Sequence, residues 1–509
     1  GNYLRRQPLP ALPALYLLTP TVESVNRFLD DFREKKPPLY ARAHLFFTSR
    51  ISDALLAKIK NSAAAMRAIG SFKELNLEFA LAEANVFTLN KPDALTTLFC
   101  DDANASVSAL KLQEQHRIAN SLATLFVALG DMPLIRFPST APRAAAVASV
   151  LQDKLDGLSR DAVGFPSRIL TDAERPLLLL LDRSFDALSP LLHEYTYQAM
   201  VHDLLQVHDD RYKYSYTSNN NQKLSKEVLL NETDPLFVKY RHMHIADLGQ
   251  RLHVDYKQFI AENKETADLN KGDQDMRAMR TGLQGVQRFQ EQTGRYSMHI
   301  SIAEELVKRY NGAGLEQISI LEQSMAVGEE INGKPYRTAM ADLRALLAKD
   351  DLLLSPEDRM RLVMIYMITQ ENIKQEDRRL LLEEAGIAPE DQVAILALFN
   401  LGVTLQQGVG ARRKESKPAE KPQDTYDVSR YVPPLRRLME EAATGALSVG
   451  EFPFVRAPTT LGMDQASSEV NSATGLNKLA TWASSGSRAK TGTESGGGGG
   501  SGGSGDGGG

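Results

Sequence analysis

Five consecutive leucines at residues 177–181 predict a short buried strand. An uninterrupted apolar run of this length is typical of a parallel strand that is covered on both faces. The run ends in the polar turn DRSFD, and the apolar positions that follow Pro190 predict a helix. In α/β enzymes, ligands bind where a strand opens at its carboxyl end into such a loop and helix. We interpret this point of the chain as a hinge between two domains.

Upstream of this strand, short apolar runs alternate with segments of helical periodicity. Val25, Phe28, Leu29 and Phe32, for example, show the i, i+3, i+4, i+7 spacing of one helix face. The predicted elements are strands at 14–20, 43–48, 75–79 and 134–137, and helices around 25–32, 52–68, 112–129 and 144–156. Gly130 is a plausible end for the third of these helices. Alternation of strand and helix indicates parallel sheets with helices on their faces, so the predicted fold class is α/β.

Downstream of the leucine strand, helical periodicity dominates. The predicted helices span 238–262, 273–310, 338–348, 358–372 and 377–386. Residues 411–424 form a charged, proline-containing loop. After residue 455 the chain is rich in Ser, Thr and Gly, a composition that cannot bury a core and predicts disorder.

Composition limits the possible partners and cellular setting. A length of 509 residues predicts two or three domains, and a net charge of −5 does not favour nucleic acid or an anionic membrane as the main partner. The single cysteine, Cys100, excludes an internal disulfide and fits a reducing compartment. No apolar run reaches the roughly 20 residues that span a bilayer. Because the chain does not begin with Met, we expect a fragment or an incomplete gene model.

The segment 177–193 also contains residue types that are used in nucleophilic catalysis. These are Asp182, Ser184, Ser189 and His193, but no G-x-S-x-G motif accompanies them. Members of a catalytic triad are brought together by the fold and not by local sequence. An α/β enzyme with its site at 177–193 is therefore kept only as an alternative. We favour a structural domain junction formed by Asp182, Arg183 and His193.

Two further motifs do not support a cofactor or a metal. Residues 328–334 match G-x-x-x-x-G-K, but Pro335 stands where a Ser or Thr should hold magnesium, so we predict a link between two helices. His242 and His244 are two residues apart on an apparent helix and would point to different faces. We predict no cofactor and no metal.

The long pattern L-D-R-S-F-D-x-x-S-P-L-L-H-E-x-T-Y-Q-A-M-x-x-D-L-L resembles the SM (Sec/Munc) family of syntaxin-binding regulators of vesicle fusion. The resemblance continues through Tyr212-Lys213-Tyr214, the run 226–230 and residues 241–246. It covers roughly residues 5–455 and is greatest to the exocytic branch. A match of this length is far more specific than a short catalytic motif.

The resemblance implies an arch-shaped fold of two parallel-sheet α/β domains with a large, mostly helical domain inserted into the second. The implied organisation is a first domain at 1–83, a second domain beginning at 84–190, a helical arm at 191–440, a return to the second domain at 441–455, and a tail at 456–509. The family fold is expected to be incomplete at both ends, lacking its opening strand and helix and the closing strands of the second domain.

The resemblance also places candidate binding residues. The family's pocket for the N-terminal peptide of syntaxin corresponds to Leu56, Ile69, Phe72 and Glu74. A helical hairpin at 273–310 resembles the SNARE-contacting tip, with Tyr296, His299 and Ile300 on its second helix. Its hinge corresponds to Gly282, Gly285 and Val286, which stand where the family often has a proline, so we expect a more mobile hairpin. Arg5 and Arg6 correspond to the edge of the central cavity.

The predicted function is to bind a syntaxin-type SNARE, and the assembled or partly assembled SNARE bundle, in vesicle docking, fusion and exocytosis. The predicted protein is a monomer without enzymatic activity, nucleic-acid binding or membrane insertion. It is expected in the cytoplasm, recruited by SNAREs to the plasma membrane or to transport vesicles. A degenerate family member that no longer binds SNAREs is the other alternative.

Overall fold

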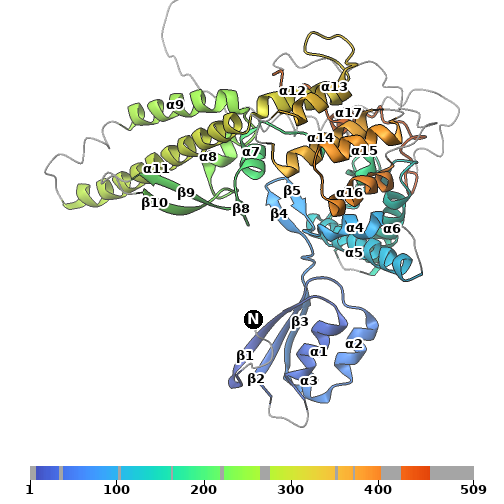
Figure 1. Ribbon diagram of the computed structural model, residues 1–509. Coiled ribbons are helices and arrows are strands. Elements are labelled where there is room, and N and C mark those ends of the chain that lie inside the picture. Colours follow the sequence, from blue (N-terminus) through green and yellow to red (C-terminus); the bar gives the residue numbers. More distant parts are fainter. Residues whose placement is uncertain are drawn as a thin grey trace, which may run out of the picture.

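A small α/β unit, a central body and an elongated arm make up the computed structural model (Figure 1). The structure describes residues 7–33, 38–100, 105–161, 164–217, 223–263, 276–349, 354–370, 373–402 and 426–458. The arm and the body lie together, and the small unit joins them through one narrow stretch of chain. The domain boundaries that we predicted between these parts stay predictions.

The N-terminal unit is a three-stranded parallel sheet in the order β1-β2-β3, with its helices packed on one face. Its elements are β1 (Leu9–Leu18), α1 (Val22–Asp30), β2 (Tyr40–Phe47), α2 (Asp53–Lys60), α3 (Ala63–Ala68) and β3 (Ile69–Glu74). Ser62 caps a new helix and divides the single helix predicted at 52–68. The predicted strand at 75–79 is wrong, because the third strand ends at Glu74.

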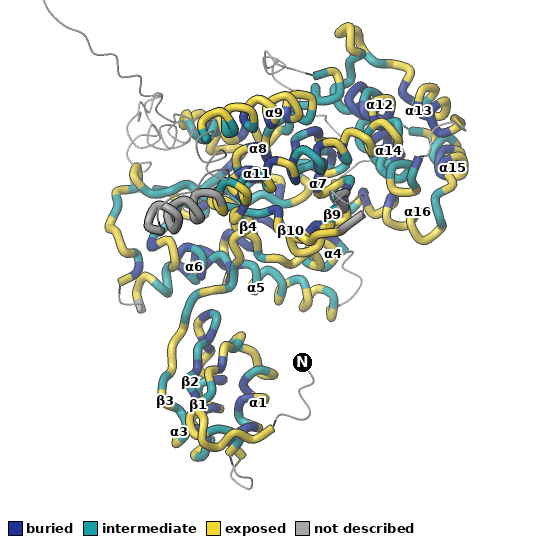
Figure 2. The backbone as a smooth tube through the Cα atoms, turned by 90° about the vertical axis from the view of Figure 1, so that its left-hand side faces the viewer, coloured by how far each residue is buried: buried dark blue, intermediate teal, exposed yellow. Residues whose placement is uncertain are grey.

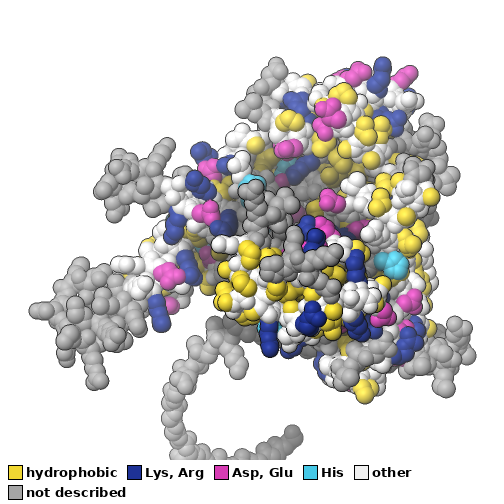
Figure 3. All heavy atoms as spheres, turned by 90° about the horizontal axis from the view of Figure 1, so that it is seen from below, with side chains coloured by type: hydrophobic (Ala, Val, Ile, Leu, Met, Phe, Trp, Pro, Cys, Tyr) yellow, Lys and Arg dark blue, Asp and Glu magenta, His cyan; other side chains and the backbone are white. Residues whose placement is uncertain are grey.

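The opposite face of this sheet is open. Leu15 and Leu17 of the edge strand β1 are 72% and 60% exposed, whereas the β2 residues that face the helices are buried. Apolar side chains are visible over this unit when the molecule is seen from below (Figure 3).

The body begins with the short hairpin β4 (Ala80–Glu83) and β5 (Val86–Thr88) and continues with α4 (Asp93–Phe99), α5 (Ala105–Leu129), β6 (Leu134–Arg136), α6 (Pro142–Asp161) and β7 (Leu177–Leu179). Strands β6 and β7 pair in parallel, as predicted. Gly130 ends α5 with a φ of 74°, which confirms the predicted cap. The leucine strand is shorter than predicted and only partly buried. The helix predicted after Pro190 begins only at Tyr197, because 3-10 turns occupy the intervening loop.

Among the described residues, six helical segments pack around the largest core of the body, and α17 (Pro434–Ala443) packs in a smaller core with Leu447 and Phe452. The six are α12 (Leu315–Val327), α13 (Ala339–Leu347), α14 (Pro356–Thr369), α15 (Gln375–Glu384), α16 (Pro389–Leu396) and η4 (Ala397–Leu401). After α17 the chain returns to β6, where the Val455 backbone N–H donates to the Ile135 carbonyl over 2.9 Å.

The arm contains α7 (Tyr197–Leu204), β8 (Val207–His208), β9 (Arg211–Thr217), β10 (Lys223–Leu229), α8 (Pro235–Tyr240), α9 (Ile245–Glu262) and α11 (Met276–Gly312). Helices α9 and α11 pack along each other, with the rings of Phe259 and Phe289 stacked at 5.4 Å. The antiparallel pair β9–β10 was not predicted, although alternating tyrosines in RYKYSYT carry the period of a strand.

The predicted hairpin at 273–310 is wrong, because α11 is one continuous helix of 37 residues. Its backbone runs without a break through Gly282, Gly285 and Val286. Glycine weakens a helix by about 1 kcal/mol relative to alanine, but it keeps its backbone N–H and so does not break the helix as proline does. Greater mobility at these residues stays a prediction.

Candidate functional site

The predicted peptide pocket lies at the β3 edge of the N-terminal unit. The parallel register places Ile69, Phe72 and Glu74 of β3 on the face that packs against the helices, despite a bulge near Gly70. Their β2 partners in this register are the buried residues Ala43, Leu45 and Phe47. Leu56 of α2 packs against the same core. The structure therefore brings the four predicted residues to one edge of the N-terminal unit, three along β3 and one on α2.

This surface combines apolar area with a carboxylate. Phe72 is 36% exposed, with its ring 5.4 Å from the ring of Phe47, and Leu56 and Ile69 are partly buried. Glu74 is exposed, and its Oε1 accepts a hydrogen bond from the Ile51 backbone N–H over 3.0 Å. An edge strand beside apolar side chains can hold an extended peptide.

Two of the three predicted contact residues on the arm are buried, so the prediction that Tyr296 and His299 contact a partner is wrong. His299 is 0% exposed and lies inside the core shared by α7, α8 and α11. Its Nδ1 lies 2.8 Å from the Tyr197 hydroxyl, and its Nε2 lies 3.2 Å from Asp234 Oδ1. Burial alone would raise the pKa of Asp234, but hydrogen bonding and charge from His299, together with hydrogen bonds from the Phe237 and Leu236 backbone N–H groups, outweigh it and lower the pKa.

The third residue, Ile300, lines an apolar groove of about 680 Å³ between α9 and α11. Ile300, Ala303 and Val307 repeat at the spacing of one helix face. The remaining lining residues are Ile245, Ala246, Gly249, His253, Glu304, Lys308 and Asn311. An apolar floor with a charged rim fits the apolar face of an amphipathic helix. We call this feature the arm groove.

The sequence carried a signal for this groove that our prediction did not use. The apolar positions 300, 303 and 307 continue beyond the residues that we assigned, on the C-terminal half of α11. Arg5 and Arg6, predicted at the edge of the central cavity, lie outside the described residues.

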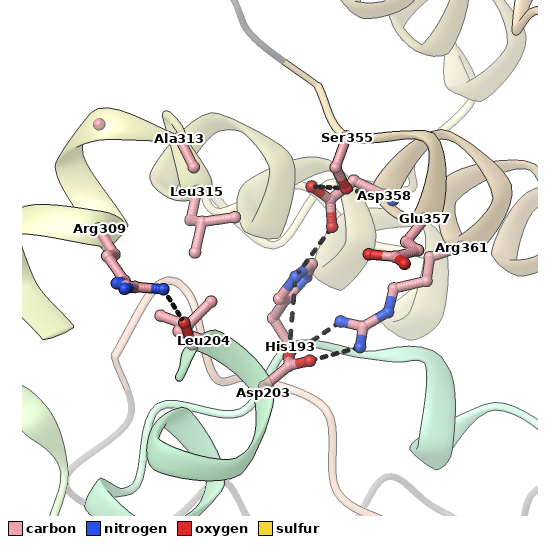
Figure 4. Close-up of a pocket in the computed structure, with 11 residues that line it drawn as sticks. His193, Asp203, Leu204, Arg309, Ala313, Leu315, Ser355, Glu357, Asp358 and Arg361 are labelled. Carbon is pink, nitrogen blue, oxygen red and sulfur yellow. Dashed lines mark hydrogen bonds and ion pairs between the residues drawn. The ribbon is translucent and has the colours of Figure 1, made fainter. Parts of the chain in front are cut away.

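His193 lies in a cluster of charged side chains from α7, α12 and α14 (Figure 4), in which His193 itself and Glu322 are buried. Its Nδ1 is 2.9 Å from Oε1 of the fully buried Glu322, and its Nε2 is 3.4 Å from Asp358. Asp203 is 3.9 Å from the same Nε2 and is held by Arg361 at 2.5 Å. Burial alone would lower the pKa of His193, but bonding to Asp358 and Glu322 outweighs it and raises the pKa to about 9.

Within the described part of the chain, the side-chain hydrogen bonds of Asp182 and Arg183 stay inside their own loop. Asp182 accepts from the Ser184 backbone N–H at 3.1 Å, and Arg183 donates to the Asp186 carbonyl at 3.3 Å. His193 instead pairs with Glu322 of α12, a partner that the sequence analysis missed, and the junction role of the three residues stays a prediction. A glutamate inside an apolar helical run was the available signal.

The local cluster behind the enzyme alternative does not assemble. The Ser184 and Ser189 hydroxyls donate to Asp182 and Asp186 of their own loop, and the contacts of the His193 ring nitrogens are to carboxylates. Among the described residues, His193 is therefore paired with carboxylates and not with a nucleophile.

The residues considered for phosphate or metal binding have structural positions. Residues 328–334 form a turn between α12 and α13, with Gly328 in the left-handed region, which confirms the predicted link. His244 is the N-cap of α9, where its Nδ1 accepts from the Ala246 backbone N–H. The prediction that His242 and His244 lie on one helix is therefore wrong, because both precede the first residue of α9. Across the described ranges, no three His, Cys, Asp or Glu side chains group as metal ligands. Within these same ranges, every helix is too short or too polar to cross a bilayer.

Comparison with known proteins identifies the family. The model of the Sec1 family matches residues 2–504. The chain belongs to the Sec1 family. Protein transport protein sec1 of Dictyostelium discoideum is 35% identical over 482 residues, which is 94% of this chain and 78% of that protein. The SNARE-interacting protein KEULE of Arabidopsis thaliana is 29% identical over 516 residues, covering 94% of this chain and 75% of that protein.

Solved structures show the same fold. The Unc18–syntaxin 1 complex from Monosiga brevicollis matches with a TM-score of 0.76 and 27% identity, over 89% of this chain and 78% of that chain. The SM protein Vps45 in complex with the Qa SNARE Tlg2 matches with a TM-score of 0.69 and 24% identity, over 90% and 79% of the two chains. The resemblance to SM proteins and the α/β fold class are therefore confirmed.

Proposed function

We propose that this Sec1-family protein binds a syntaxin-type SNARE and regulates assembly of the SNARE bundle in vesicle docking, fusion and exocytosis. The observation that carries the proposal is its likeness, at 27% identity over 89% of the chain, to a family member in complex with syntaxin 1. A relative at 29% identity is itself named for SNARE interaction.

Two separate surfaces bind different parts of the SNARE partners. The β3 edge with Leu56, Ile69, Phe72 and Glu74 takes the N-terminal peptide of syntaxin. The arm groove around Ile300 takes the apolar face of a SNARE helix. Tyr296 and His299 hold α11 in place from inside the arm. A protein that holds one partner at two points lowers the orientational cost of bringing further helices to it.

The proposed activity is non-enzymatic, and the protein is located where its SNARE partners are. The serine and histidine residues of the 177–193 segment bond to aspartates and glutamates, which supports a structural role for them. The protein works as a monomer that SNAREs recruit to the plasma membrane or to transport vesicles. Contact of Arg5 and Arg6 with syntaxin in the central cavity stays part of the proposal.

Calorimetric titration of the full chain with a syntaxin cytosolic region, with and without its N-terminal peptide, tests this function. We expect saturable binding that weakens about tenfold without the peptide. Phe72→Arg should remove that difference, because a cation in the pocket disrupts apolar contact. Leu81→Arg, on the exposed face of β4, is the matched control and should leave it intact.

Two results contradict the proposal. If the wild-type chain melts cooperatively but does not bind syntaxin, the result favours the alternative that this protein is a degenerate family member without SNARE binding. If neither removal of the N-terminal peptide nor Phe72→Arg changes the affinity for syntaxin, the β3 edge does not bind the peptide.

A further inference from the structure

The N-terminal unit is joined to the rest of the molecule by a neck at residues 75–79, visible as a single stretch of chain in two views (Figures 1 and 2). The unit has its own core, separate from the cores of the body and the arm. Inter-domain orientation is variable unless specific contacts hold it. The contacts at the neck therefore decide how the unit is oriented.

The neck is tied to the N-terminal unit by its backbone. The Leu75 and Leu77 backbone N–H groups donate to the carbonyls of Phe47 and Thr48, over 2.8 and 2.6 Å. These bonds continue the pairing of β3 with the end of β2. The neck consequently moves with the sheet that carries the proposed peptide surface.

One side chain of the neck joins this unit to α5. Oε1 of Glu78 accepts from the Thr48 hydroxyl at 3.1 Å and from the Ser49 hydroxyl at 2.6 Å. Its Oε2 accepts from the Ser121 hydroxyl at 3.5 Å, and its backbone N–H donates to the Thr124 hydroxyl at 3.3 Å. Ser49 and Ser121 are buried, so loss of the Glu78 carboxylate leaves their hydroxyls without this acceptor.

The next segment is fixed to the arm. Oε1 of Glu83 in β4 accepts from the Gln198 amide at 2.7 Å, and its Oε2 pairs with the buried Arg241 at 3.4 Å. Arg241 also pairs with Glu232 at 2.5 Å. The chain between the N-terminal unit and the arm is thus held at both ends, at α5 by Glu78 and at the base of the arm by Glu83.

We propose that Glu78 is a positioning residue that fixes the N-terminal unit on α5 and so sets the separation of the peptide surface from the arm groove. The second half of this inference rests on the proposed function. Binding at two linked points gains from effective concentration only when the geometry lets both engage together. Glu78 then contributes to two-site affinity without touching the partner.

Double electron–electron resonance on the full chain tests the orientation directly. Spin labels are placed at Lys60→Cys on α2 and Leu112→Cys on α5, both exposed, in a Cys100→Ser background. We expect one narrow distance distribution in the parent protein and a broad one after Glu78→Ala. An equally narrow distribution after Glu78→Ala would overturn the proposal.

A conservative variant and a matched control variant distinguish a role of Glu78 in orienting the N-terminal unit from a general effect on stability. Glu78→Gln should restore the narrow distribution, because its carbonyl still accepts from Thr48 and Ser49 and its amide can donate to Ser121. Glu23→Ala, which removes an exposed carboxylate of the same unit, should leave the distribution unchanged. If Glu78→Ala does not melt cooperatively, Ser121→Ala combined with Thr124→Val removes both bonds of Glu78 to α5, from its carboxylate and from its backbone N–H, and should broaden the distribution.

Binding provides the second readout. Glu78→Ala should leave the affinity for the isolated syntaxin N-terminal peptide within about twofold and weaken binding of the whole cytosolic region about tenfold. Unchanged affinity for the whole region would overturn the link between orientation and binding. If the parent protein binds no syntaxin, the proposed function fails, while the distance distributions still decide the role of Glu78.

Discussion

At the scale of single residues, the charge cluster around His193 makes stability depend on pH. Its folded-state pKa is raised to about 9, above the ordinary value of 6.5, because bonding to Asp358 and Glu322 outweighs burial. A raised histidine pKa stabilises the fold fully below pH 6.5, and this contribution is lost as pH rises through 9. We expect the free energy of unfolding, measured with urea, to fall by up to about 3 kcal/mol between pH 6.5 and 9.5.

His193→Gln provides the comparison for this prediction. Glutamine carries no titrating charge, so the variant should be less stable at pH 6.5 and should show a flatter profile up to pH 9.5. Glu322 is fully buried beside this residue, and an unpaired buried carboxylate is strongly destabilising. Parallel profiles for the parent protein and the variant would show that the loss of stability comes from other groups.

At the scale of elements, neighbouring positions on α11 should respond in opposite ways. Ile300→Arg puts a charge in the arm groove and should weaken SNARE-helix binding about tenfold, with a smaller loss of stability than a substitution inside the arm core, because Ile300 is only partly buried. Tyr296→Ala opens a cavity in the arm core and should cost about 3–5 kcal/mol of stability. Titration and thermal melting of both variants test this, with Val254→Arg on the exposed face of α9 as control. Equal loss of binding in Ile300→Arg and Val254→Arg would contradict a groove-specific contact.

This contrast also shows how far the sequence could predict the elements. Helical spacing and a glycine stop located α5 and its end at Gly130, because both signals are local. Periodicity could not tell how deeply each apolar position of α11 is buried, since Tyr296 and Ile300 lie one turn apart on the same face. The predicted hairpin bend failed because two glycines permit a bend without requiring one. The β3 pocket residues came from the family resemblance, and their common face depends on strand register, which spacing alone did not supply.

At the scale of the whole molecule, Arg136 of β6 joins segments more than 300 residues apart. Its guanidinium donates to the carbonyls of Phe452, Leu447 and Ser448 at 2.7, 3.0 and 2.9 Å, in an almost fully buried position. It also lies over the ring of Phe454, 4.5 Å from the centroid. The planar fork of arginine suits several acceptors at once, and lysine does not replace it.

Removing this side chain should destabilise the body and spare the N-terminal unit. Arg136→Ala leaves three buried carbonyls without a donor and should lower the unfolding free energy of the body by about 3 kcal/mol. Arg168→Ala removes an exposed ion pair with Asp131 and should cost less than about 1 kcal/mol. Native-state hydrogen exchange should show faster exchange in β6 and α17 and unchanged exchange in the strands of the separate N-terminal core. Equal acceleration in β1–β3 would contradict independent stability and would mean that the neck transmits unfolding across the whole chain.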